Sequence, residues 1–195
     1  MKKIIIIGSG GHAKACLDVL LSEKKFEFKG FIDNEIKNKN ILGTDDDLKK
    51  IFKKIKYVMI GIGQIKSPIY RLRIFRKLKK IGFLLPVIRS SFSYVSKSAK
   101  IEEGTVIMHG AIINANAKIG KNTIINSKAL IEHDAIIGDN CHISTNSTVN
   151  GGSIVGDNTF VGSRAVITNN IRIGKSKFIK AGSLIKKNII WKKLL

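Results

Sequence analysis

Residues 111–137 read AIINANAKIGKNTIINSKALIEHDAII and carry an isoleucine at every sixth position, from Ile113 to Ile137. The same spacing continues in both directions, from Val95 to Ile185, and all sixteen positions are Ile or Val. The residue two places before each aliphatic residue is usually Ala, Ser, Thr or Cys. A six-residue period fits neither an α-helix, which repeats every 3.6 residues, nor a long strand, which repeats every two.

The six-residue period predicts a coil of short strands with a corner after each strand. Three hexads then form a triangular turn, and stacked turns would lie about 4.8 Å apart. The residue directly after the aliphatic is often Gly or Asn, as at Gly120 and Asn126. Both types tolerate the positive φ values that turn corners, so we expect the corners there. The pattern resembles that of hexapeptide-repeat proteins, which implies a left-handed parallel β-helix.

Residues 1–90 carry a different pattern. Apolar runs at 4–7, 28–32 and 57–60 are typical of buried parallel strands, and helical periodicity lies between them. This alternation predicts a small Rossmann-like α/β domain. The fold class is therefore α/β plus β-solenoid, with domains at 1–90 and 91–195. A further helix should begin at Pro68, with an inner face of Leu72, Phe75, Leu78 and Ile81.

A glycine-rich segment, Gly8-Ser9-Gly10-Gly11-His12-Ala13, follows the first expected strand. It has the Gly-x-Gly-x-x-Gly/Ala spacing of dinucleotide-binding loops, and Asp33 ends the second strand. The alternative is a tight strand-to-helix turn without a ligand. Three expected strands supply only half of a dinucleotide fold, so a mononucleotide diphosphate such as a nucleotide-sugar fits better.

The charge of the chain admits a nucleic-acid-binding scaffold as an alternative. Lys and Arg number 35 against 14 Asp and Glu, which gives a formal net charge of +21. Only six of the basic residues are Arg, whereas base reading and bidentate phosphate contacts favour Arg. With two cysteines and no run of about 20 apolar residues, we expect a cytoplasmic protein without membrane insertion.

His133 follows the inward Ile131 by two residues, so its imidazole should face outward near a corner. Acidic residues flank it, and they would raise its basicity and fix its orientation. A plain surface histidine is the alternative. His142 lies nine residues further on, half of an 18-residue turn, so the two histidines should face different ways and make a poor metal pair. We expect no metal.

Together, the Gly-Ser-Gly-Gly-His loop at residues 8–12 and the coil segment Ser-x-x-Leu-Ile-Glu-His-Asp at 127–134 resemble one bacterial sugar acetyltransferase family. That family contains sialic-acid O-acetyltransferases and UDP-4-amino-sugar N-acetyltransferases of the bacillosamine pathway. The resemblance spans nearly the whole chain. It implies acetyl-CoA as co-substrate, a nucleotide-sugar site in the first domain, an acetyl-CoA site in the second, and a homotrimer with active sites between subunits.

The resemblance also assigns roles to individual residues. His133 corresponds to the general base, and Asp134 to the adjacent acid that raises its basicity. His142 matches a histidine that contacts acetyl-CoA, and Ser163 and Ala181 match backbone positions that line the coenzyme. The nucleotide-sugar site would comprise Gly10, Gly11, His12, Asp33 and Asn34, together with Gly61 and Gly63 at the end of the third expected strand.

The function implied is N-acetylation of the 4-amino group of a UDP-linked 4-amino-4,6-dideoxy-sugar, of the UDP-2-acetamido-4-amino-2,4,6-trideoxyhexose type. Transfer would be direct, with no covalent intermediate required. Cys141 lies in the small-residue column of the coil and is expected to pack there and not to act as a nucleophile. One alternative keeps the fold and changes the acceptor to a hydroxyl of sialic acid or a related nonulosonic acid. A structural solenoid without chemistry and the nucleic-acid scaffold are the others.

Overall fold

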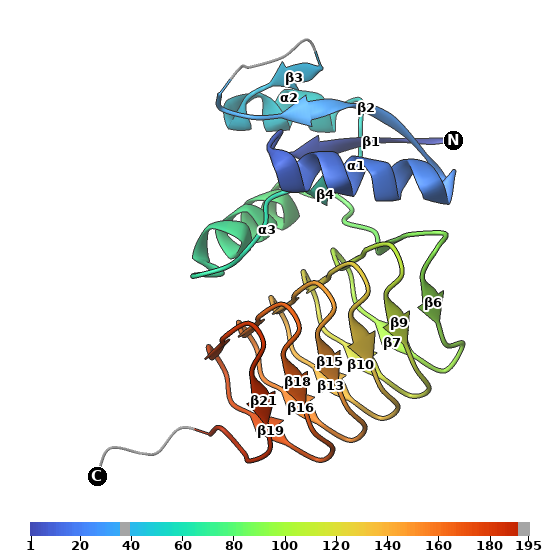
Figure 1. The fold of residues 1–195 in the computed structure, drawn as a ribbon. Helices are drawn as coiled ribbons and strands as arrows, with labels where there is room; N and C mark the ends of the chain where they lie inside the picture. Colours follow the sequence, from blue (N-terminus) through green and yellow to red (C-terminus); the bar gives the residue numbers. More distant parts are fainter. Residues whose placement is uncertain (36–39, 191–195) are drawn as a thin grey trace.

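The structure is a computed structural model that describes residues 1–35 and 40–190 (Figure 1). An N-terminal α/β half lies along one side of a C-terminal coil of short strands. The predicted fold class is confirmed. Residues 191–195, which belong to the second predicted domain, lie outside the described residues.

The α/β half contains a four-stranded parallel sheet in the order β3-β2-β1-β4. Its strands are β1 (Lys2–Ile7), β2 (Phe26–Ile32), β3 (Ile41–Gly43) and β4 (Tyr57–Ile60). The apolar runs predicted β1, β2 and β4. They did not predict β3, a three-residue edge strand that is partly exposed and so has no apolar run.

Helices α1 (Gly11–Glu23), α2 (Leu48–Phe52) and α3 (Ile69–Ile81) complete this half, with a 3₁₀ turn, η1 (Asp45–Asp47), before α2. The predicted inner face of α3 was incomplete, although Phe75 and Ile81 do pack against the core beside Leu78. Leu78 is buried, but Leu72, Phe75 and Ile81 are only half-buried, and the other fully buried residues of the helix are Arg71 and Ile74. The apolar pattern could not indicate that a charged residue faces inward.

The coil consists of three parallel sheets of two-residue strands. The first sheet contains β5 (Ile88–Arg89), β8 (Val106–Ile107), β11 (Ile124–Ile125), β14 (His142–Ile143), β17 (Phe160–Val161) and β20 (Phe178–Ile179). The second contains β6 (Tyr94–Val95), β9 (Ile112–Ile113), β12 (Leu130–Ile131), β15 (Thr148–Val149), β18 (Val166–Ile167) and β21 (Leu184–Ile185). The third contains β7 (Lys100–Ile101), β10 (Lys118–Ile119), β13 (Ile136–Ile137), β16 (Ile154–Val155) and β19 (Arg172–Ile173).

The six-residue ladder forms the core of the coil, as predicted. Its Ile and Val side chains point inward together with the small-residue column, and Cys141 is fully buried among them. Since each aliphatic residue stacks on the one 18 residues away, the turns stabilise one another and no hexad buries its own side chain alone.

The predicted position of the corners was wrong. The left-handed residues recur three places after the aliphatic, at every sixth position from Gly104 to Gly182, and not one place after it. A glycine directly after the aliphatic has another role. At Gly162, for example, a Cβ would lie 2.8 Å from the backbone of Ala181 on the next turn. Close packing of turns therefore selects glycine there.

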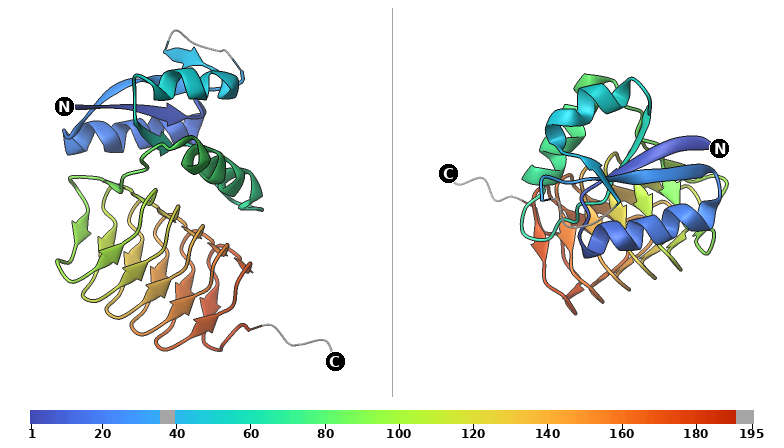
Figure 2. Two further views of the ribbon diagram at one scale, coloured as in Figure 1. Left: turned by 180° about the vertical axis from the view of Figure 1, so that it is seen from behind. Right: turned by 90° about the horizontal axis from the view of Figure 1, so that it is seen from above.

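The α/β half lies over part of the outer face of the first sheet (Figure 2), since His142 on β14 is buried whereas Phe178 on β20 is exposed. Apolar side chains from both halves share one cluster, in which Ile88, Val106 and Met108 of the coil pack with residues of β1 and α1. The first strand of the coil thus lies before the predicted boundary at residue 90, and the division into two domains stays a prediction. Within the described ranges, no helix is long and apolar enough to cross a membrane.

Candidate active site

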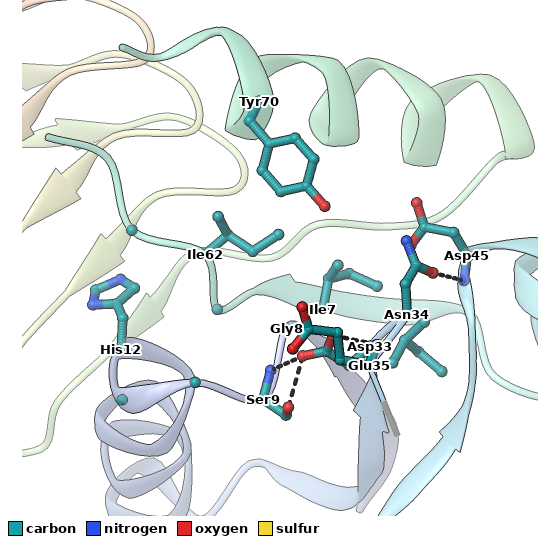
Figure 3. Close-up of a pocket in the computed structure, with 15 residues that line it drawn as sticks. Ile7, Gly8, Ser9, His12, Asp33, Asn34, Glu35, Asp45, Ile62 and Tyr70 are labelled. Carbon is teal, nitrogen blue, oxygen red and sulfur yellow. Dashed lines mark hydrogen bonds between the residues drawn. The ribbon is translucent and has the colours of Figure 1, made fainter. Parts of the chain in front are cut away.

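A cavity of about 550 Å³ opens at the carboxyl ends of β1, β2 and β4 (Figure 3). Parallel α/β sheets bind ligands at this edge, because the loops that follow neighbouring strands meet there. The structure brings together in the wall of this cavity all the residues predicted for the nucleotide-sugar site: Gly10, Gly11, His12, Asp33, Asn34, Gly61 and Gly63.

Asp33 holds the glycine-rich loop against the end of β2. Its Oδ2 accepts hydrogen bonds from the backbone N–H of Ser9 (2.8 Å) and from the Ser9 hydroxyl (2.6 Å). Asn34 makes a similar contact, because its Oδ1 accepts from the backbone N–H of Asp45 (3.0 Å). These bonds fix the polar wall of the cavity before any ligand binds (Figure 3).

The first turn of α1 borders the cavity at Gly10 and Gly11. Gly10 is the N-cap residue and provides no side-chain cap, and a Cβ at either glycine would meet no heavy atom within 4 Å. Free N–H groups and the helix dipole attract anions at such an end. The cavity can therefore accept a phosphate group beside the start of α1.

Sequence reasoning missed several lining residues. Tyr70 reaches the cavity from the start of α3, opposite the glycine-rich loop (Figure 3), while Asp45 comes from η1 and Ile62 from the segment after β4. Glu35 follows β2 and also lines the cavity. Glu35 and Ile62 had a sequence signal, because each comes just after a predicted strand.

Arg71 is buried at the junction of α3, the segment after β4 and the coil. Its Nη1 donates to the carbonyl oxygens of Ile60 (2.8 Å) and Ile62 (2.7 Å), and its Nε donates to that of Asn122 on the coil (3.3 Å). Burial lowers the pKa of Arg71 to about 10, so the guanidinium stays charged at neutral pH. One side chain thus ties the floor of the cavity to the coil.

Replacing Arg71 with methionine is expected to lower the free energy of unfolding by about 2–3 kcal/mol, because the buried carbonyl groups lose their donors. Urea unfolding at neutral pH would measure the change. The matched control is Arg73→Met, on the exposed face of the same helix, which should change stability by less than about 0.5 kcal/mol. Equal effects of the two substitutions would contradict this role of Arg71.

His142 faces the same junction from the coil. Its Nδ1 donates to the carbonyl oxygen of Gln64, and its Nε2 accepts from the Asn126 amide (3.0 Å), so the ring is neutral. The ring of His12 lies 6.5 Å away, between centroids. Burial, followed by a smaller effect of the nearby Arg71 charge, lowers the pKa of both histidines to about 4, although the hydrogen bond to Gln64 acts in the opposite direction on His142. The coenzyme contact of His142 stays a prediction.

These two histidines make stability depend on pH. In the unfolded chain a histidine binds a proton below about pH 6.5, whereas folded His142 stays neutral down to about pH 4. Stability is therefore lost as pH falls through this window, by about 3 kcal/mol for His142. Urea unfolding of the wild type and of His142→Phe from pH 7 to 4 would test this. The variant should show the weaker dependence, and equal slopes would contradict the assignment.

The predicted catalytic pair lies at the corner between β12 and β13. His133 and Asp134 expose 60% and 57% of their side chains, and His133 Nδ1 lies 2.9 Å from Asp134 Oδ2. The hydrogen bond from His133, followed by one from Asn116, lowers the pKa of Asp134. Because the carboxylate accepts from Nδ1–H, the lone pair of His133 lies on Nε2. Gly151 gives the ring room, since a Cβ there would lie 2.7 Å from Nε2.

One chain does not bring all the predicted residues together. His133 lies at the corner that joins the second sheet to the third, whereas Ser163 and Ala181 lie at the corner that joins the first to the second. The hydroxyl of Ser163 lies 3.0 Å from that of Ser144 on the previous turn. Across residues 1–35 and 40–190, no three His, Cys, Asp or Glu side chains form a group that could hold a metal ion.

Both halves of the chain match known protein families. The PglD N-terminal domain family matches residues 3–78, and the bacterial transferase hexapeptide (six repeats) family matches residues 98–133 and 117–151. PerB from Caulobacter crescentus, solved in complex with CoA and GDP-perosamine, is 27% identical, with a TM-score of 0.91 over 98% of this chain and 92% of that one. Both halves thus match the hexapeptide-repeat sugar acetyltransferase family.

Another solved relative supports the fold of this acetyltransferase. The acetyltransferase domain of PglB from Neisseria gonorrhoeae, in complex with acetyl coenzyme A, is 24% identical, with a TM-score of 0.91 over 97% of this chain and 93% of that one. A search of curated proteins found no significant match.

Proposed function

We propose that this acetyltransferase uses acetyl-CoA to acetylate the 4-amino group of a UDP-linked 4-amino-4,6-dideoxy-sugar, of the UDP-2-acetamido-4-amino-2,4,6-trideoxyhexose type. The observation that carries the proposal is the hydrogen-bonded His133–Asp134 pair on the coil, in a chain that also has a nucleotide-sized cavity. A solved relative described as a perosamine N-acetyltransferase from Caulobacter crescentus supports an amino-sugar acceptor.

The cavity at the end of the α/β sheet is proposed to bind the nucleotide. Its volume of about 550 Å³ and its single helix N-terminus suit one nucleoside diphosphate. The diphosphate would lie beside Gly10 and Gly11, and the polar groups around Asp33 and Asn34 would contact the nucleoside. The sugar would then extend out of the cavity towards the coil.

His133 is proposed to act as general base in direct transfer. The amine nitrogen forms a bond to the carbonyl carbon of the thioester while Nε2 of His133 accepts the proton that the nitrogen loses. The tetrahedral intermediate collapses, the carbon–sulfur bond breaks, and His133 returns the proton to the leaving thiolate. Asp134 keeps Nδ1 protonated throughout. No acyl-enzyme is needed, and burial raises the pKa of Cys141 to about 12, far from that of a reactive thiolate.

We propose a homotrimer in which the sites lie between subunits. The outer face of the second sheet carries an exposed apolar column that includes Tyr94, Ile112 and Leu184, which a neighbouring coil would cover. Such contact would bring His133 of one subunit towards the cavity of the next, and the coenzyme would lie between coils near His142, Ser163 and Ala181. The reaction would take place in the cytoplasm and serve glycan biosynthesis.

Acceptor specificity tests the proposal. Purified protein is mixed with acetyl-CoA and one acceptor at a time, and free thiol is followed: a UDP-4-amino-4,6-dideoxy-sugar, the GDP-linked 4-amino sugar perosamine, or sialic acid. We expect turnover with the UDP-amino sugar. Turnover with the GDP-linked sugar alone would overturn the choice of nucleotide, and turnover with sialic acid alone would overturn N-acetylation.

A further inference from the structure

The corner that carries His133 stacks between two neighbouring turns of the coil. Strand β12 pairs in register with β9, so that Leu130 lies beside Ile112, and residues 18 apart therefore stack on each other at the corner as well. Asn116 accordingly lies next to Asp134 on the preceding turn. On the following turn stands Gly151, the residue that leaves room for the imidazole.

Asn116 fixes the orientation of the Asp134 carboxylate. Its Nδ2 donates to Asp134 Oδ1 (3.2 Å), while Asp134 Oδ2 accepts from His133 Nδ1 (2.9 Å). Each carboxylate oxygen thus has one donor, and rotation of the carboxylate would break both bonds. Asn116 is itself anchored, because its backbone N–H donates to the hydroxyl of Ser98 one turn earlier (3.0 Å).

The second acidic neighbour is held away from the ring. Asn114 Nδ2 donates to Oε2 of Glu132 (3.0 Å), and the same oxygen accepts from the backbone N–H of His133 (3.3 Å). Asn114 and Asn116 of one turn therefore each hold one carboxylate of the next turn. Asp134 contacts the imidazole, and Glu132 contacts the backbone.

We propose that Asn116 is a positioning residue for the general base, holding Asp134 so that Nδ1 of His133 stays protonated and the lone pair stays on Nε2. This inference rests on the proposed role of His133. A support is needed because both members of the pair are exposed, and an exposed carboxylate otherwise samples several rotamers. An amide suits this role because it is uncharged, so it orients the carboxylate and leaves its negative charge in place. A lysine would neutralise that charge.

A glycine substitution tests the role without straining the backbone. Asn116 has a φ of +59°, which glycine adopts freely, so Asn116→Gly removes the amide alone. We expect kcat to fall about tenfold with KM for both substrates unchanged, because the reacting groups lose alignment and not affinity. The matched control is Asn170→Gly, at the same type of corner with the same φ of +59°, which should keep wild-type kcat.

A second variant and a parallel measurement on His133 distinguish failure of this inference from failure of the proposed general base. In Asn116→Asp the new carboxylate cannot donate to Asp134 and repels it, so kcat should fall at least as far as in Asn116→Gly. Wild-type kcat in both variants, or a rise in KM at unchanged kcat, would overturn the positioning role. His133→Asn is measured beside them. Activity in that variant would overturn the proposed base. Loss of activity in His133→Asn, with wild-type kcat in both Asn116 variants, would overturn only the inference.

Discussion

Replacing His133 with asparagine is expected to lower kcat by about two to four orders of magnitude, the usual contribution of a positioned general base. Asparagine keeps a polar side chain at the exposed corner but accepts no proton at neutral pH. Release of free thiol from acetyl-CoA in the presence of the amino sugar would measure the change. Because the imidazole is 60% exposed and packs in no core, the melting temperature should stay within about 2 °C of the wild type.

Subunit mixing would then test whether His133 serves the cavity of another subunit. In Gly11→Glu the new anionic side chain projects into open space beside the start of α1 and should block a diphosphate there. His133→Asn and Gly11→Glu chains, each inactive alone, are unfolded together in equal amounts and refolded. Random trimers should recover about a quarter of the wild-type sites if each site combines two subunits. No recovery would contradict intersubunit sites, and full activity of His133→Asn alone would contradict the base.

Replacing Gly162 with alanine is expected to destabilise the fold by about 3 kcal/mol, at the upper end of the cost of overpacking. The new Cβ would lie 2.8 Å from both the Cα of Ala181 and the carbonyl oxygen of Ile179. These are backbone atoms of the next turn, so the turns must separate, and the hydrogen bond from Gly162 N–H to Ile179 (2.9 Å) is strained. Thermal unfolding should show a decrease in melting temperature of about 6–12 °C.

Gly110→Asn is the control for this prediction. Gly110 has a φ of +68°, and its Cβ would come closest to the flexible side chain of Lys128, at 3.3 Å, with the Lys128 backbone at an ordinary van der Waals distance of 3.9 Å. Asparagine occupies equivalent corners at Asn116 and Asn140 with φ values of +59° and +54°. The variant should melt within about 2 °C of the wild type. If Gly110→Asn were as unstable as Gly162→Ala, close packing of turns would not be the cause.

The sequence predicted the coil because its repeat is a long-range property. Each Ile or Val of the ladder has a partner 18 residues away, so the spacing alone determined which residues stack. The corner residues were harder to predict. Glycine serves two columns, packing turns together at Gly162 and adopting a left-handed φ at Gly182, and composition does not distinguish the two causes.

The residues of the candidate site could likewise be predicted only in part. Residues that come directly after strands, such as Asp33 and Gly61, could be predicted to line one cavity because the ends of parallel strands meet. Residues that depend on how the halves pack could not. Arg71 lies in a helix whose apolar pattern pointed to other positions, and His142 is hydrogen-bonded to a carbonyl group 78 residues away in sequence.

The apolar cluster shared by α1, β1 and the start of the coil joins the cores of the two halves. Ile88 and Val106 belong to the coil by hydrogen bonding, yet they complete the core of the α/β half. A coil freed of that half would present these side chains to water, along with Ile124 beside them on the first sheet. The two halves should therefore unfold in a single cooperative transition, and a truncated coil would be an aggregation-prone fragment and not a smaller enzyme.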